Sequence, residues 1–157
     1  MKPAGARKPR TLVIGYGNPM RGDDGLGRVV ADHLARLALP GVEVLSLHQL
    51  TIDLAAVVAD YDRVILIDAV SDAPPGEVQL VEVHPENSAP GMSHYVTPGE
   101  LLLATGALYG ARPRMTLAGV GAETFDGDRL SPVVEQALPA VHAQIERLVR
   151  GGHEPGV

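Results

Sequence analysis

The segment from Arg63 to Ala69, with the sequence RVILIDA, constrains the fold of this chain more than any other. Its centre is an unbroken run of large apolar residues from Val64 to Ile67. Continuous runs of this kind are typical of strands whose two faces are both buried, and such strands occur mainly in parallel sheets that helices cover. We therefore predict an α/β protein in which this segment is a central strand.

The rest of the chain fits that prediction, because short apolar runs alternate with segments of helical spacing. Residues 72–76, DAPPG, predict a turn, so the strand that follows is expected to run antiparallel at an edge of the sheet. Thr97, Pro98 and Glu100 predict a helix that begins with a capping box. Strands are predicted at 11–15, 42–47, 63–69, 77–83 and 114–119, and helices at 26–37, at 52–58, from 97 and from 131.

Length and composition restrict the class of protein and its partners. A chain of 157 residues, 45% of them hydrophobic, is expected to form one domain at 11–150, between a disordered basic tail at 1–10 and a flexible tail at 151–157. The net charge is −6 and only four Tyr and one Phe are aromatic, so we expect no nucleic-acid partner. No apolar run approaches the roughly 20 residues that span a bilayer, and none is long enough for a signal peptide. We therefore expect a cytoplasmic protein without membrane association.

The chain contains no cysteine, which leaves His, Asp and Glu to carry any metal or acid–base chemistry. The first predicted strand leads into a glycine-rich segment at 15–27, GYGNPMRGDDGLG. A dinucleotide site is the weaker interpretation, because Met20 stands where the fingerprint needs its third glycine and no acidic residue ends the second strand. We expect Gly17, Asn18 and Asp23 to shape the loop, with Asp23 as a lesser candidate for a second acid.

Asp24 and Asp68 are the stronger candidates for chemistry. If the strand order is 2-1-3, the loops after the first and third strands meet at the carboxyl edge of the sheet, the usual ligand site of such folds. His94, just before the capped helix, is expected at the same edge. Two carboxylates and one imidazole suit an open site for nickel, zinc or manganese. The alternative is that Asp24 caps the first helix, Asp68 caps a turn and His94 is a solvated surface residue.

Four segments, in order along the chain, resemble the hydrogenase maturation proteases, the endopeptidases that trim the large subunit of nickel-iron hydrogenases. They are GYGNPMRGDDGLG at 15–27, DRVILIDAV at 62–70, MSHYVTPGELL at 92–102 and VGAETFDGDRLSPVVEQALPAV at 120–141. Together they span nearly the whole domain. The resemblance implies a single three-layer α/β/α domain around a twisted, mostly parallel sheet.

The resemblance also implies a reaction, the removal of a C-terminal extension from the nickel-loaded large-subunit precursor of a nickel-iron hydrogenase. The family's catalytic and metal-contacting positions match Asp24, Asp68 and His94. Nickel is then supplied by the precursor, and zinc or cadmium is expected to replace it in the isolated protein.

Two mechanisms remain open for that reaction. Either the three residues hold the nickel, which positions the peptide and polarises its carbonyl or activates water, or one carboxylate acts as the general base on water, as in an aspartic protease. The alternative function is that of a non-catalytic nickel-binding assembly factor for the same hydrogenase.

Overall fold

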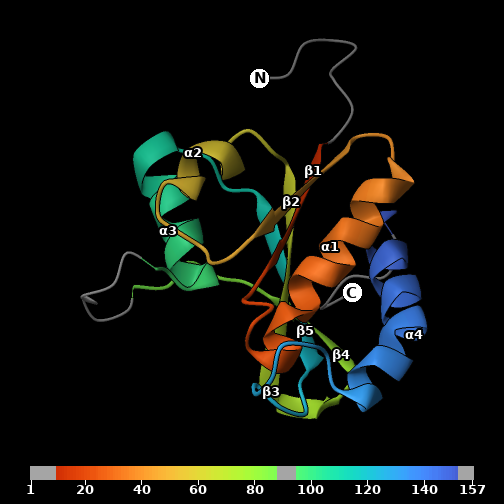
Figure 1. Ribbon diagram of the computed structural model, residues 1–157. Coiled ribbons are helices and arrows are strands. Elements are labelled where there is room, and N and C mark those ends of the chain that lie inside the picture. The colour runs from red at the N-terminus through yellow and green to blue at the C-terminus, as the bar shows by residue number, and fades with distance from the viewer. Residues whose placement is uncertain (1–9, 88–94, 152–157) are drawn as a thin grey trace.

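The computed structural model describes residues 10–87 and 95–151. Within these ranges five strands form one sheet in the order β2-β1-β3-β5-β4 (Figure 1). All neighbours pair in parallel except β4, which pairs antiparallel with β5 at the edge of the sheet. The strands are β1 (Thr11–Tyr16), β2 (Val42–Leu47), β3 (Arg63–Pro75), β4 (Val78–Glu82) and β5 (Arg114–Gly121).

Helices cover both faces of this sheet, α1 and α4 on one side and α2 and α3 on the other (Figure 1). The helices are η1, a short 3₁₀ turn (Gly22–Gly25), α1 (Leu26–Leu37), α2 (Leu54–Val58), α3 (Pro98–Tyr109) and α4 (Pro132–Val149). The predicted three-layer α/β/α fold is therefore confirmed. Among the described residues, no helix combines the length and apolar character needed to cross a membrane. The predicted tails lie outside the described residues, apart from Arg10 and Gly151, and so does His94.

The central apolar run supplies both cores, because successive side chains of a strand point to opposite faces of the sheet. In β3, Ile65 and Ile67 pack against α1 and α4. Val64 and Leu66, which alternate with them, pack against α2 and α3. All four side chains are fully buried, which explains why the segment tolerates no polar residue between them.

β3 continues further than the sequence predicts, and the turn expected at 72–76 is confirmed only in its second half, where the Glu77 N–H donates to the Pro74 carbonyl at 3.0 Å. Pro75 still pairs with Gly121 of β5, after an irregularity in the ladder. The residue before a proline is restricted to extended conformations, and two consecutive prolines impose this restriction twice. The chain therefore reverses only at Gly76, whose φ is 79°.

The reversal at Gly76 leads into β4, which is antiparallel and at the edge as predicted, but its partner is β5 and not β3. The connection therefore crosses the end of β5, where the Gly76 N–H donates to the Gly121 carbonyl at 2.8 Å. A Cβ on Gly121 would lie 1.9 Å from the Pro74 carbonyl oxygen. Only glycine leaves room for this crossing.

The predicted capping box at the start of α3 is confirmed. The Glu100 N–H donates to the Thr97 hydroxyl oxygen at 3.2 Å, and the Thr97 N–H donates to the Glu100 carboxylate at 2.8 Å. Pro98 occupies the first turn, where its missing N–H costs nothing. Local sequence alone therefore determines where α3 begins.

Candidate functional site

The structure brings Asp24 and Asp68 to the same place, an open pocket of about 450 Å³ at the carboxyl edge of the sheet. Asp24 lies in η1, directly after β1, and Asp68 lies in β3. β1 and β3 are neighbours, so the strand order 2-1-3 from which the sequence argument began is present. Arg21 and Phe125 also line this pocket. The two carboxylates therefore face one solvent-accessible space, Asp24 from the turn that follows β1 and Asp68 from β3.

Asp24 is positioned by a tight fold of the loop that precedes it. Its Oδ2 accepts a hydrogen bond from the Asn18 N–H at 2.8 Å. Gly17 has a φ of 148°, and a Cβ at this position would lie 1.8 Å from the backbone oxygen of Asp24. Glycine is therefore required for the loop to return to Asp24. Asp24 does not cap α1, because the N-cap of α1 is Gly25 and makes no side-chain hydrogen bond.

Asp68 lies within β3, opposite Gly119 of β5, and not in a turn. The Tyr16 hydroxyl lies close enough to its carboxylate to influence its ionisation. Burial raises the pKa of Asp68 to about 6, with a further contribution from the charge of Asp24, although the Tyr16 hydroxyl and the Ala69 N–H act in the opposite direction. Burial and the two carboxylates also raise the pKa of Tyr16, so its hydroxyl keeps its proton and remains a donor. Asp68 is thus a largely desolvated carboxyl group with the Tyr16 hydroxyl and the charge of Asp24 nearby.

His94 lies outside the described residues, but the chain is placed again from its neighbour onward. Tyr95 forms a bridge with Thr51, and the Val96 N–H donates to the Leu50 carbonyl at 3.2 Å. These partners belong to the loop that follows β2, also at the carboxyl edge of the sheet. No group of three or more His, Asp or Glu that would hold a metal occurs within the described ranges. Asp24 and Asp68, two of the three predicted ligands, therefore share one pocket, and metal binding by any of the three stays a prediction.

Asp23 has a structural role that its neighbours in the sequence do not indicate. Its side chain is fully buried, and it accepts hydrogen bonds from residues about 100 positions away in the chain. The donors are the N–H groups of Glu123, Thr124 and Ser131, at 2.8, 3.2 and 2.7 Å, and the Ser131 hydroxyl at 2.8 Å. No local pattern indicates such partners, since they are assembled only by the packing of the loop at 122–131 against η1.

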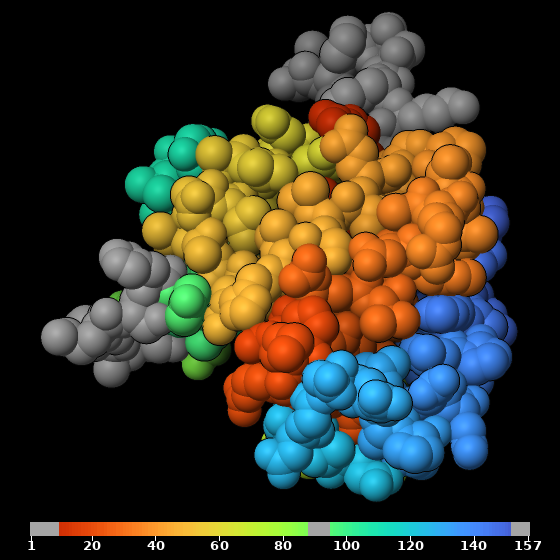
Figure 2. Space-filling model, viewed as in Figure 1, coloured from red at the N-terminus to blue at the C-terminus, as the bar shows by residue number. Residues whose placement is uncertain are grey.

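This loop at 122–131, between β5 and α4, forms one side of the candidate site. Figure 2 shows it packed directly against the residues that follow β1. Besides the bonds to the Asp23 side chain, the Gly22 N–H donates to Gly127 at 2.6 Å. The loop brings Phe125 into the pocket wall, where the Arg21 guanidinium lies 5.8 Å from its ring centre. Asp23 therefore holds the loop that completes the pocket around Asp24 and Asp68.

The hydrogen bonds to Asp23 predict that acid weakens the fold. Burial alone would raise the pKa of Asp23, but the donors from Ser131, Glu123 and Thr124 outweigh it and lower the pKa below 3.8. A carboxyl group whose pKa is lower in the folded state stabilises the fold above its unfolded pKa, and this stabilisation is lost as the pH falls through the folded pKa. In urea titrations, we expect the difference in free energy of unfolding between wild type and Asp23→Asn to be constant above about pH 5 and to shrink below about pH 4. A difference that is unchanged down to pH 3 would contradict this assignment.

Comparison with known proteins finds relatives that act in hydrogenase maturation, although no family model matches the chain. The hydrogenase expression/formation protein HoxM of Azotobacter vinelandii is 34% identical over 154 residues, which cover 92% of this chain and 74% of HoxM. The hydrogenase expression/formation protein HupD of Bradyrhizobium diazoefficiens is 29% identical over 160 residues, covering 96% of this chain and 83% of HupD.

The solved structures that resemble this chain also include proteins of hydrogenase maturation. The hydrogenase 2 maturation peptidase from a Thaumarchaeota archaeon is 28% identical with a TM-score of 0.65, over 89% of this chain and 97% of that one. The chain belongs to the hydrogenase maturation protease family. The fold is also that of the [NiFe] hydrogenase maturation protease HycI from Thermococcus kodakarensis, with a TM-score of 0.73 at 20% identity, over 90% of this chain and 93% of that one.

As a hydrogenase maturation protease, the chain has a role in hydrogenase maturation and belongs among peptidases. The alternative of a dinucleotide-binding module is also disfavoured by the electrostatics of the site. The crevice after β1, where such a module binds a pyrophosphate, is lined here by the carboxylates of Asp24 and Asp68. Two negative charges at that position repel a phosphate.

Proposed function

We propose that this hydrogenase maturation protease is an endopeptidase that removes a C-terminal extension from the nickel-loaded large-subunit precursor of a nickel-iron hydrogenase. The observation that carries the proposal is the meeting of Asp24 and Asp68 in one open pocket at the carboxyl edge of the sheet. In this proposal the nickel belongs to the precursor, and Asp24, Asp68 and His94 contact it from the protease. The names of the relatives support a role in hydrogenase maturation. The two carboxylates in the pocket support hydrolysis of a peptide bond.

The open character of the site favours recognition of a metal that another protein already holds. Two carboxylates and one imidazole occupy fewer positions than nickel coordinates, so the remaining positions stay with the ligands of the precursor. A nickel ion shared in this way connects the two proteins and places the peptide to be cut beside the carboxylates. A precursor without nickel lacks this connection.

We assign the proton-accepting step of hydrolysis to Asp68. A water oxygen attacks the carbonyl carbon of the peptide bond, Asp68 accepts a proton from that water, and the proton passes to the leaving nitrogen as the C–N bond breaks. Burial raises the pKa of Asp68 to about 6, which suits a group that accepts a proton near neutral pH, whereas one oxygen of Asp24 holds the preceding loop through the Asn18 N–H. A carboxylate has two oxygens, so contact with nickel through one leaves the other for the proton.

The direct test is incubation of the purified protein with nickel-loaded and with metal-free precursor. We expect mass spectrometry to show loss of a C-terminal peptide only from the nickel-loaded form, and restoration of cutting when nickel is added to a competent metal-free precursor. His94→Ala is expected to lose both complex formation and cutting. Equal cutting of both precursors would contradict nickel recognition, and an unchanged length of the nickel-loaded precursor would favour the non-catalytic assembly factor.

A further inference from the structure

The outer face of α3 is unusually apolar for a helix at the surface. Glu100 is the only charged residue among its twelve, and Leu103, Leu108 and Tyr109 are exposed by 39%, 64% and 53%. A surface helix normally carries polar residues on its outward face, and a helix that is apolar on all sides is usually buried. Exposed apolar surface of this kind marks sites where another molecule binds.

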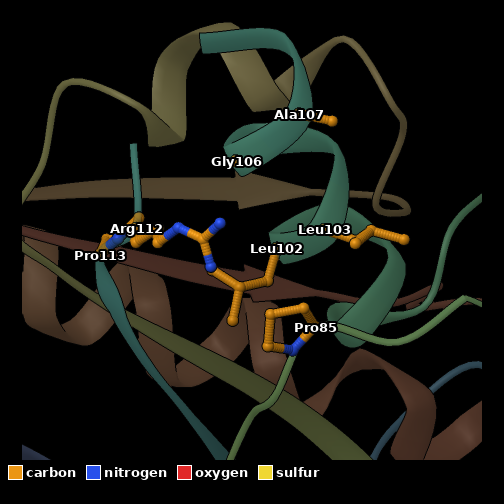
Figure 3. Close-up of a pocket in the computed structure, with 7 residues that line it drawn as sticks. All are labelled: Pro85, Leu102, Leu103, Gly106, Ala107, Arg112 and Pro113. Atoms are coloured by element: carbon orange, nitrogen blue, oxygen red, sulfur yellow. The ribbon is translucent and has the colours of Figure 1, made fainter. Parts of the chain in front are cut away.

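This face borders a pocket of about 360 Å³ between α3 and the segments that flank β4 and β5 (Figure 3). Its walls come from α3, with Leu102 and Leu103, and from Pro85 after β4. Arg112, in the segment before β5, is the only charged residue among the described residues that line it. In Figure 3 its side chain extends toward Leu102 rather than away from the pocket.

Arg112 has no acidic partner in the part of the chain that the structure describes. A guanidinium is a fixed positive charge whose planar donors match a carboxylate in a two-point contact. The pocket therefore combines apolar walls with a cation that an anionic ligand would satisfy. Its complement is an apolar group with a carboxylate close beside it.

The C-terminal residue of a polypeptide has this combination, because its side chain and its free carboxylate share one Cα. An internal acidic residue fits less well, since successive side chains of an extended chain point to opposite sides. An apolar residue and an acidic one that point to the same side are then about 7 Å apart. A volume of about 360 Å³ is at the small end of ligand pockets and suits one terminal residue rather than a longer segment.

We infer that this pocket binds the C-terminal residue of the precursor's extension, with its carboxylate on Arg112 and its apolar side chain beside Leu102 and Pro85. The inference rests on the proposed function for the source of the peptide. Arg112 precedes β5, at the edge of the sheet opposite the carboxylates, so the pocket holds the free end of an extension that reaches from one edge to the other, and it adds binding without taking part in bond cleavage.

Binding of short peptides tests the pocket without any cleavage. The probe is a fluorescein-labelled hexapeptide that ends in leucine with a free carboxylate, measured by fluorescence polarisation. We expect Arg112→Gln, or amidation of the C-terminus, to weaken binding at least about tenfold, because each removes a charge-assisted hydrogen bond. Arg112→Lys should retain part of the affinity, and Arg147→Gln, at an exposed arginine of α4, should retain all of it.

Equal binding of the free and amidated peptides to the wild type would overturn the inference. So would an unchanged affinity of Arg112→Gln, once circular dichroism and thermal melting show that the variant is folded. Tighter binding of an amidated peptide with an internal aspartate would assign the pocket to internal acidic segments instead, and would also overturn it.

Kinetics with nickel-loaded precursor separate this inference from the proposed function. Arg112→Gln is expected to raise KM with kcat unchanged, as for the loss of binding that is equal in the ground and transition states. If the wild type cuts the precursor and Arg112→Gln has an unchanged KM, the pocket assignment fails and the proposed function stands. If the wild type never cuts, the proposed function fails, and the peptide titration still decides whether the pocket binds C-termini.

Discussion

Asp68→Asn is expected to fold normally and to lose cleavage of the precursor by about 10²–10⁴-fold, the range associated with removal of a positioned general base. The substitution keeps the shape of the side chain and an oxygen near the Tyr16 hydroxyl. It removes only the charge. Because burial raises the pKa of Asp68, the ionised form is disfavoured in the folded state, and its removal should leave the melting temperature unchanged or raise it.

The measurement is the rate of appearance of the cut precursor by mass spectrometry, together with thermal melting of each variant. Asp60→Asn is a matched control, because Asp60 is exposed and precedes β3 at the opposite edge of the sheet. It should retain full activity. A folded Asp68→Asn with wild-type activity would remove Asp68 from the mechanism.

Asp23→Ala is expected to lower the free energy of unfolding by about 3–5 kcal/mol, since buried donors that lose their acceptor cost about 1–3 kcal/mol each. The substitution leaves Glu123, Thr124 and Ser131 without the carboxylate that their N–H groups contact. For a protein of this length the corresponding fall in melting temperature is about 10 °C or more. Asp23→Asn keeps an acceptor oxygen without the charge, so an intermediate loss is expected.

Urea or thermal unfolding of the variants measures this loss. Asp32→Ala, at an exposed position of α1, is the control and should change the free energy of unfolding by less than about 0.5 kcal/mol. If Asp23→Ala were as stable as Asp32→Ala, the hydrogen bonds of Asp23 would not hold the loop at 122–131. Loss of activity in a stable Asp23→Ala would instead favour the interpretation of Asp23 as a second acid.

Much of the fold could be predicted because its signals are local. The apolar run from Val64 to Ile67 predicts a strand buried on both faces, and the structure divides its side chains between the two cores. The capping residues Thr97 and Glu100 mark the start of α3 by hydrogen bonds that span only three residues. Patterns of this kind are contained in consecutive residues, so they can be recognised without knowledge of the rest of the chain.

Part of the candidate site followed from topology. Asp24 and Asp68 were predicted to meet because parallel neighbouring strands end at the same edge of a sheet, and the structure places both in one pocket. The pairing of β4 with β5 was not predicted, because the short connection suggested only direction and edge position. The partner of β4 is β5, which begins more than thirty residues after β4 ends. No pattern near β4 in the sequence indicates so distant a partner.

Periodicity and the order of strands are enough to predict the class of fold, the start of its helices and the two carboxylates of the site. The role of Asp23 in holding the loop at 122–131, and the place of Arg112 in an apolar pocket beside α3, become visible only in the folded chain. The difference lies in the range of the interactions. A buried carboxylate is satisfied by whichever donors packing brings to it, and those donors are about 100 residues away in the chain.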